Sequence, residues 1–242
     1  GNCVYMRPVF LAGCGKEAGM DKETFWKVIG EVNRCVEDGD QEAVLEATQR
    51  KLMEYSAADI ARWHEIKGVY MQLADRNDLW AACAATGTHC TDDGFIDFRS
   101  WLISQGKDVY MQVLQDPDSL AEVEIPKEGA DFEAYGYVAL YAYGQKKEIE
   151  TKGLASVLKD YLTWIGREGQ TSAESYLRVL EYRNDAYQEI DAHPLGEKEK
   201  DEILSEVELR PDISSCWNRE MLPEIVPRLC WKYGVGQGMD MS

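Results

Sequence analysis

The sequence predicts an all-α protein, a single multi-helix globular domain with an added helical segment in its C-terminal half. Apolar residues recur every three to four positions along most of the chain, which is the spacing of one face of an α-helix. No stretch of convincing length alternates apolar and polar residues as a half-buried strand does. Short oxygen-bearing side chains, which are typical of helix N-caps, precede several of these stripes. Together the observations favour helices packed on helices.

Three helices are expected in the first part of the chain, over residues 21–36, 40–52 and 56–73. Asp21 is placed to cap the first, while Met20 and Phe25 have the spacing of a hydrophobic staple across its start. Ser56 and Asp59, three residues apart, resemble a capping box at the start of the third.

The middle of the chain continues the pattern. A short apolar piece covers 79–85, and the run 91–106 reads as a helix with a clear start and stop. Another helix begins at Asp108 and stops at 116–118, where Pro117 interrupts the pattern. Residues 123–129 are expected to form a loop, and 131–144 an aromatic helix. The many tyrosines of that helix indicate core and interface packing.

The second half keeps the helical period. Apolar stripes run over 154–165 and 177–187, and a charged run at 197–202 opens a short helix with a solvated face. Prolines then interrupt the helical pattern in a C-terminal segment that contains Trp217, Leu229 and Trp231. We therefore expect an N-terminal extension (1–19), a helical domain (20–234) and a tail (235–242). Within the domain, 150–210 is an inserted segment whose apolar stripes need the surface of 20–145 to cover them.

The run 91–106 holds the candidate site. Its apolar stripe predicts that Phe98 and Trp101, together with the nearby Trp80, are largely buried. One interpretation is a capped core helix with a solvated charged flank. The other is a polar pocket lined by Asp92, Asp93, Arg99, Trp80 and Trp101. In both, a carboxylate should hold the guanidinium of Arg99, and we expect one of Asp92, Asp93 or Asp78.

The same run imitates half of a calcium-binding loop, with Gly94 at the turn position. The first ligand would then be His89 and the last Ser100, where a calcium loop needs an acid and a bidentate glutamate. Two key carboxylates are missing, so calcium is not expected.

Charge limits the partners. The chain has 242 residues, 45% of them hydrophobic and 29% charged, with a formal net charge of −18. Such a charge argues against binding nucleic acid or an anionic membrane, whose phosphates need a basic face. It permits a basic protein partner, and homo-oligomerisation stays open.

The seven cysteines are scattered without the close spacing of a metal site, and the chain has three histidines. We expect neither metal nor cofactor, and free thiols in a reducing cytoplasm. Residues 1–19 lack the apolar core of a signal peptide because Arg7 and Pro8 interrupt it. No stretch reaches the apolar length of a membrane span. A cytoplasmic protein is therefore predicted.

Several sequence blocks, taken in order, resemble a bacterial family designated domain of unknown function 4240. The blocks include Met20-Asp21, Phe25-Trp26, Leu79-Trp80, Asp92-Asp93, Phe98-Arg99 and Trp101-Leu102-Ile103. Trp217, Leu222-Pro223 and Pro227-Arg228-Leu229 resemble the closing segment of the family. The resemblance covers 20–145 and 215–234 and implies that 1–19 and 150–210 are additions. It brings no established reaction, cofactor or substrate.

Three functions follow as hypotheses. The first is a non-enzymatic regulatory or protein-binding module, favoured because the sequence shows no nucleophile–base pair, phosphate loop or metal spacing. The second is an immunity-type protein that neutralises a basic toxin, suggested by the charge. The third is an enzyme in which Asp92 or Asp93 is the general base and Arg99 clamps an anion.

Overall fold

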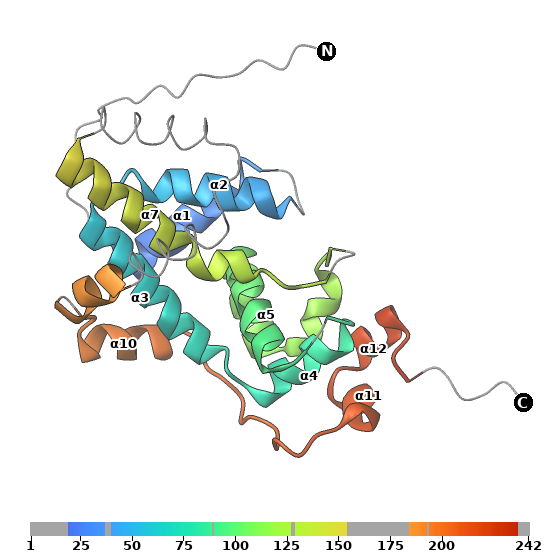
Figure 1. Ribbon diagram of the computed structural model, residues 1–242. Helices are drawn as coiled ribbons and strands as arrows, with labels where there is room; N and C mark the ends of the chain where they lie inside the picture. The colour runs from blue at the N-terminus through green and yellow to red at the C-terminus, as the bar shows by residue number, and fades with distance from the viewer. Residues whose placement is uncertain are drawn as a thin grey trace, which may run out of the picture.

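The protein is all-α, as predicted (Figure 1). The computed structural model describes residues 19–36, 40–88, 90–126, 129–153, 184–192 and 194–236, and in these ranges it contains helices and loops and no strand. The helices that carry names are α1 (Lys22–Asn33), α2 (Gln41–Leu52), α3 (Ala57–Leu73), α4 (Asn77–Ala85), α5 (Asp92–Ser104), α6 (Lys107–Gln115), η1 (Pro117–Glu122), α7 (Glu133–Lys152), α10 (Glu197–Leu204), η2 (Arg219–Met221), α11 (Leu222–Ile225) and α12 (Pro227–Tyr233). Residues 184–192 are also helical.

The first three helices begin where they were predicted to begin, and each has a side-chain cap. The side chains of Asp21, Asp40 and Ser56 each accept a hydrogen bond from the backbone N–H three residues further on, at 2.8, 3.0 and 3.1 Å. Each bond satisfies an amide that the first helical turn leaves without a partner. Met20 and Phe25 are both buried at the start of α1, as the predicted staple requires.

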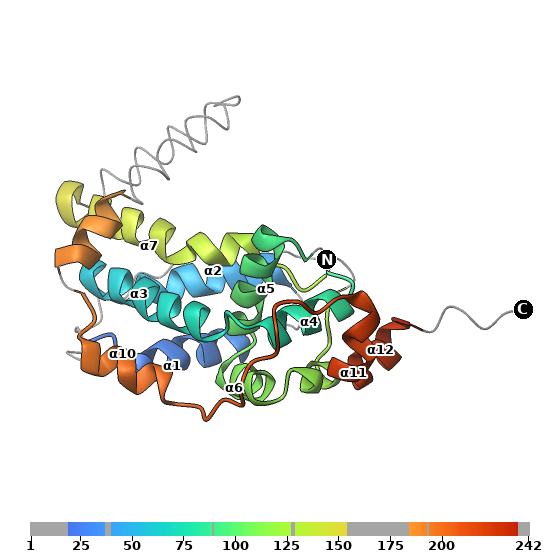
Figure 2. The same ribbon diagram turned by 90° about the horizontal axis from the view of Figure 1, so that it is seen from below.

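Helix α3 is the centre of the core and packs against α1, α5, α7 and α10 (Figures 1 and 2). Its Trp63 and Tyr70 meet Phe25 and Trp26 of α1, with ring centroids 4.7–5.2 Å apart. Tyr110 of α6 joins this cluster by donating its hydroxyl to the backbone carbonyl of Tyr70 at 2.6 Å. Aromatic side chains of this size bury large apolar areas, so the cluster ties three helices together.

Two elements differ from the expectation. The aromatic helix α7 runs to Lys152, beyond the predicted end at 144. The chain after α6 does not simply stop, because Pro117 opens the 3-10 helix η1. A proline suits the first helical position, because the N–H that it lacks has no partner within the helix there. The side chain of Asp116 caps this turn by accepting from the N–H of Asp118 at 3.3 Å.

The C-terminal segment crosses the core as a strap, which we define as residues 205–236. After α10 the chain runs alongside the core and reaches α4, where α11 and α12 pack on α4 and η1 (Figure 2). Prolines occupy the first turns of both short helices, which the sequence analysis did not predict as helices. Leu222, Val226 and Leu229 of the strap are buried.

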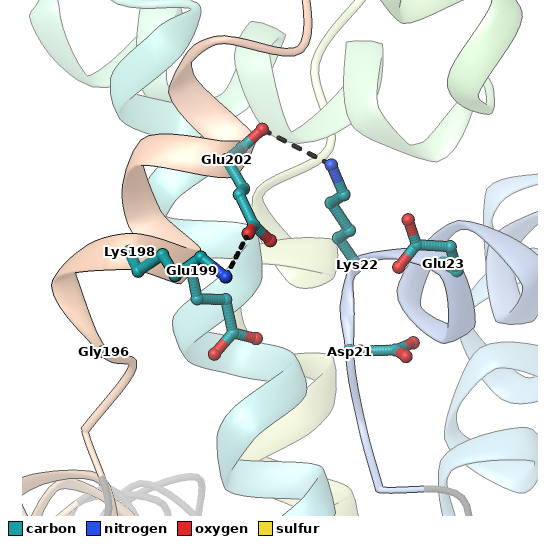
Figure 3. A pocket seen from close by; sticks show the side chains of 7 residues that line it. All are labelled: Asp21, Lys22, Glu23, Gly196, Lys198, Glu199 and Glu202. Atoms are coloured by element: carbon teal, nitrogen blue, oxygen red, sulfur yellow. Dashed lines mark hydrogen bonds and ion pairs between the residues drawn. The ribbon is translucent and has the colours of Figure 1, made fainter.

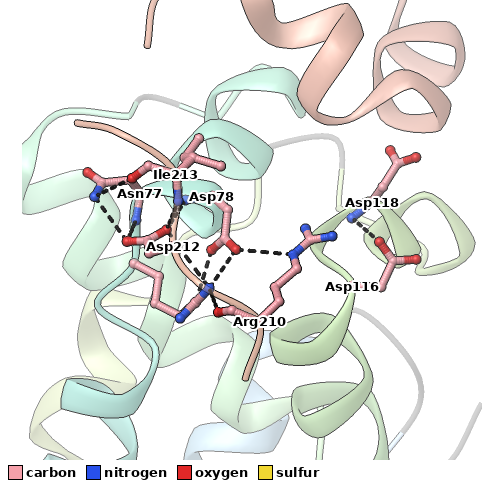
Figure 4. A network of polar contacts seen from close by, with 8 residues as sticks. Asn77, Asp78, Asp116, Asp118, Arg210, Asp212 and Ile213 are labelled. Carbon is pink, nitrogen blue, oxygen red and sulfur yellow. Dashed lines mark hydrogen bonds and ion pairs between the residues drawn. The ribbon is translucent and has the colours of Figure 1, made fainter. Parts of the chain in front are cut away.

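One end of the strap is fastened at the start of α4 (Figure 4). Asp212 accepts hydrogen bonds from the N–H groups of Asn77 and Asp78 at 2.8 and 3.0 Å. It thereby caps α4, whose own N-cap residue Arg76 makes no side-chain capping bond. Asp78 is fully buried and forms a bidentate pair with Arg76 at 2.8 and 3.1 Å. Arg210 of the strap lies 3.5 Å from the same carboxylate.

The other end is fastened at η1. Arg228 forms ion pairs with Asp116, Asp118 and Glu122 at 2.7, 3.1 and 2.7 Å. Asp118 also accepts from the N–H groups of Arg228 and Leu229 at 3.1 and 3.0 Å, which caps the start of α12. The strap is thus held by charge and by capping at two separate places.

Several predictions lie outside the described residues. Residues 1–18 and 237–242 do so, and with them most of the predicted N-terminal extension and tail. The stripe 154–165 and most of the stripe 177–187 also lie outside, so the docking of the whole insertion 150–210 stays a prediction. Within the described ranges, no helix is long and apolar enough to cross a membrane.

Candidate functional site

Helix α5, which holds the predicted site, has the expected local structure. Thr91 caps it by accepting from the N–H of Gly94 at 3.2 Å, and Gly106, with φ of +100°, follows its end. Phe98 and Trp101 are buried, as predicted, whereas Trp80 is only half-buried. The apolar side of α5 is therefore part of the core.

Arg99 is held by a carboxylate, as predicted, but the expected partner is wrong. Its guanidinium lies 3.3 Å from Asp75 and donates to the backbone carbonyl of Met71 at 2.9 Å. Both partners lie near the C-terminal end of α3, where carbonyls lack helical partners and a cation is favourable. The predicted alternative Asp78 is instead engaged by Arg76 and Arg210. Burial lowers the pKa of Arg99 and the charge of Asp75 opposes the change, but an arginine stays protonated.

The predicted pocket residues are brought together only in part. Trp80 stacks on Phe95 with ring centroids 5.0 Å apart, and the guanidinium of Arg99 lies 4.7 Å from the centroid of the same ring. Asp92 and Asp93 are exposed on the first turn of α5, and neither forms an ion pair with Arg99. The geometry therefore gives no pairing of a general base with an anion clamp among these residues.

Asp92 and Asp93 instead belong to a cluster of acids where α5 and α7 begin. The N–H of Phe132, the residue before α7, donates to the carbonyl of Asp97 at 3.3 Å. This contact brings Asp131 and Glu133 beside α5. We define the acidic patch as Asp92, Asp93, Asp97, Asp131 and Glu133. No residue of the patch has an ion pair with another described residue.

Asp97 is the residue of the patch at which like charges crowd together. Burial raises its pKa, and the charges of Glu133, Asp131 and Asp93 raise it further, while Lys67 acts in the opposite direction. A raised pKa means that the folded protein disfavours the ionised form. At neutral pH the ionised carboxylate of Asp97 therefore costs folding free energy.

Lys67, a basic side chain of α3, is buried near Asp97 of the patch. Lys67 is 4% exposed, and its ammonium donates to the carbonyl of Gly136 at 3.4 Å. Burial lowers its pKa to about 8, and the charge of Asp97 opposes the change. One turn away, burial lowers the pKa of His64 to about 3, with a smaller contribution from the charge of Lys67. Perturbed groups of this kind gather at functional sites.

Lys67 was not among the predicted site residues. Its position carried a signal, because it follows Trp63 by four residues and Ile60 by seven and so shares the buried face of α3. A lysine at an apolar position of a helical stripe can mark a buried charge. The closeness of Asp97 had no such signal, because only the packing of α5 on α3 and α7 creates it.

A surface hollow of about 410 Å³ lies between the start of α1 and α10 (Figure 3). It is lined by Asp21, Lys22, Glu23, Gly196, Lys198, Glu199 and Glu202. Several of its charges already have partners: Lys198 pairs with Glu202 at 3.5 Å, and Lys22 donates to the carbonyl of Glu202 at 3.4 Å. The Lys22 contact joins α1 to α10, and the Lys198–Glu202 pair lies within α10. Because these charges are already engaged, the hollow is a weaker candidate than the acidic patch.

The fold and the patch define an all-α protein with a crowded acidic face at one helix junction. The chain belongs to the family described as "Protein of unknown function (DUF4240)", which matches residues 20–145. The matched region contains α1 to α6 and most of α7, and with them the whole acidic patch. No curated protein and no solved structure matches the chain.

Proposed function

We propose that the protein is a binding module that holds a basic protein partner on the acidic patch. The observation that carries the proposal is the electrostatic strain at Asp97, whose pKa is raised by burial and by the charges of Glu133, Asp131 and Asp93. Charges that lower folding stability are common where function requires them. A basic partner would relieve this repulsion on binding.

The surface around the patch supports a protein partner. Ile96, between Asp93 and Asp97 in the sequence, is 45% exposed, and Tyr137 on the next turn of α7 is 38% exposed. Interfaces commonly combine an apolar or aromatic anchor with charged groups at the rim. The net charge of −18 would in addition steer a basic protein toward the molecule.

The proposal covers two of the roles expected from the sequence, a regulatory binding module and an immunity-type protein against a basic toxin. Both require the same chemistry at the patch, and the identity of the partner distinguishes them. The third role, catalysis by Asp92 or Asp93 with Arg99, receives no support from the geometry because those groups do not meet. We further propose a cytoplasmic location, which suits the free cysteines of the described residues.

The test compares two variants with equal net charge. The patch variant carries Asp92→Asn, Asp93→Asn, Asp131→Asn and Glu133→Gln. The control variant neutralises four exposed carboxylates elsewhere: Glu124→Gln, Asp201→Asn, Glu208→Gln and Glu220→Gln. Each immobilised protein is incubated with a lysate of the source organism at low salt, and the bound proteins are eluted with increasing salt.

We expect the wild type and the control variant to retain the same basic protein and the patch variant to lose it. Salt of about 0.5 M should release the partner, because screening shortens the range of exposed charges. Equal retention by both variants would contradict the proposal. So would a retained partner with an acidic isoelectric point. Melting curves of both variants verify that they remain folded.

A further inference from the structure

Two cysteines meet where α4 ends and α5 begins. Cys83 is fully buried on α4, and Cys90 is half-buried directly before the N-cap of α5. Trp80 contacts Cys90 twice: its indole N–H donates to the carbonyl of Cys90 at 3.3 Å, and the Cys90 thiol donates to the carbonyl of Trp80 at 3.7 Å. These two contacts hold Cys90 against one face of α4.

Cys83 lies on that same face. It follows Trp80 by three residues, and side chains on a helix lean toward its N-terminus, so the Cys83 thiol extends over the turn of Trp80. The Cys90 thiol, 3.7 Å from the carbonyl of Trp80, lies over the same turn. The two thiols are therefore neighbours, and Cys90 has the largest effect on the pKa of Cys83.

Hydrogen bonds hold the part of the turn that directly follows Cys83. The hydroxyl of Thr86 donates to the carbonyl of Cys83 at 2.7 Å and lies 2.8 Å from the hydroxyl of Thr88. Thr88 in turn accepts from the N–H of Ala130 at 3.0 Å. Gly87, with φ of +80°, allows the reversal of direction. The return of the chain toward α4 is thus built into the fold.

The two thiols are not equivalent. The neighbouring Cys90 thiol and burial both raise the pKa of Cys83, which therefore keeps its proton. Cys90 is the one that solvent reaches, and access is required for reaction with a small oxidant. In this arrangement the half-buried Cys90 reacts first and the fully buried Cys83 follows.

We propose that Cys83 and Cys90 are a redox modification site that forms a reversible disulfide on reaction with hydrogen peroxide. The sulfur of Cys90 attacks one peroxide oxygen, the O–O bond breaks, and the departing oxygen takes a proton and leaves as water. Cys90 is then a sulfenic acid. The sulfur of Cys83 attacks the Cys90 sulfur, the S–O bond breaks, and the hydroxyl leaves with the proton of Cys83 as a second water. The two sulfurs together lose two electrons, and the peroxide gains them.

The sequence offers a direct assay. Trypsin cleaves after Arg76 and after Arg99 and at no position between, so one peptide, 77–99, contains both cysteines and no others. The folded full-length protein is treated with hydrogen peroxide, alkylated with iodoacetamide under denaturing conditions, digested and analysed by mass spectrometry. Cys35 and Cys216, which are exposed, report in their own peptides that oxidation has occurred.

We expect peptide 77–99 to become lighter by two hydrogen atoms and to carry no alkyl group. If the oxidised protein is treated with dithiothreitol before alkylation, the same peptide should carry two alkylated cysteines. In Cys90→Ser, Cys83 should stay reduced because of its burial. In Cys83→Ala, Cys90 should instead gain oxygen. The proposal is overturned if wild-type peptide 77–99 is still doubly alkylated when Cys35 is oxidised. Oxygen added to Cys90 beside an alkylated Cys83, or a disulfide from either residue to another cysteine, would also overturn it.

Discussion

Asp97 is a single side chain at which the stability and the proposed function of the protein oppose each other. Burial and the neighbouring carboxylates raise its pKa, so the folded state binds its proton more tightly than the unfolded state does. The protein therefore loses stability as pH rises from the unfolded value of 3.8 through the raised folded value. A substitution that removes the charge of Asp97 should therefore stabilise the folded protein at neutral pH.

We predict that Asp97→Asn raises the free energy of unfolding near neutral pH by on the order of 0.5 kcal/mol, a small value because water screens this half-exposed group. The gain should vanish below about pH 3.5, where Asp97 is protonated in both states. Urea unfolding at the two pH values measures the difference. Asp201→Asn, in the exposed face of α10, is the control and should leave stability unchanged at both. If the variant remains more stable than the wild type in acid, the charge of Asp97 is not the cause of the stabilisation.

Lys67 behaves in the opposite sense. Burial lowers the pKa of this base from 10.5 to about 8, so the folded state disfavours its charged form. The penalty is fully present below about pH 8 and disappears as pH rises to the unfolded value of 10.5. At neutral pH, Lys67 therefore costs the protein stability.

Replacement by methionine should remove this penalty, because methionine fills a similar volume without a charge. We predict that Lys67→Met raises the free energy of unfolding by roughly 2–3 kcal/mol near neutral pH, with the gain shrinking toward pH 10. Lys152→Met, at the exposed end of α7, is the matched control. A loss of stability at neutral pH would mean that the ammonium contributes more through Gly136 and Asp97 than its burial costs.

For individual residues, the sequence predicted helix α5 and its buried Phe98 and Trp101, but it did not predict which groups pair with the charged side chains. The caps Asp21, Asp40 and Ser56 were predictable because an N-cap bond spans three residues of one chain segment. The pairing of Arg99 with Asp75 and the position of Lys67 near Asp97 depend on how separate helices pack. No local pattern encodes contacts of that kind.

Among the elements, the strap shows how much a few charged groups can hold. α12 has only seven residues, from Pro227 to Tyr233, and helices this short are unstable alone. Asp118 supplies what α12 lacks, since it caps two of its N–H groups and pairs with Arg228. Only 11% of the Asp118 side chain is exposed, whereas 62% of Glu122 is.

We predict that Asp118→Ala lowers the free energy of unfolding by about 2 kcal/mol, because two amides and a guanidinium lose their acceptor. Glu122→Ala, which removes a surface ion pair of the same Arg228, should cost less than about 1 kcal/mol. Hydrogen exchange of the Leu229 and Cys230 amides should accelerate strongly in the first variant only. Similar exchange rates in both variants would mean that burial of apolar side chains, and not capping by Asp118, stabilises the strap.

Element prediction was most successful where helices are long. α1, α2, α3 and α5 each show several turns of apolar periodicity, and their starts carry side-chain caps. α11 has four residues and therefore barely one turn, so no period could reveal it. The prolines at 223 and 227 suggested interruptions, although each one opens a helix.

For the whole molecule, the all-α class was predictable and the arrangement was not. The alternation of capped apolar stripes fixes the class, yet nothing local shows that the strap returns to α4 and η1. The family match over 20–145 leaves out the segment that caps α4 through Asp212 and covers it with α11 and α12. The matched region is therefore not the whole structural unit around α4.

The return of the strap has a consequence for biosynthesis. Translation proceeds from the N-terminus, so α4 leaves the ribosome more than a hundred residues before Asp212 and α12 exist to cap and cover it. During that interval the start of α4 has unpaired amides, and the part of α4 on which α11 and α12 pack lacks that cover. Helix α4 therefore reaches its final surroundings only after a segment more than a hundred residues later in the chain has been synthesised.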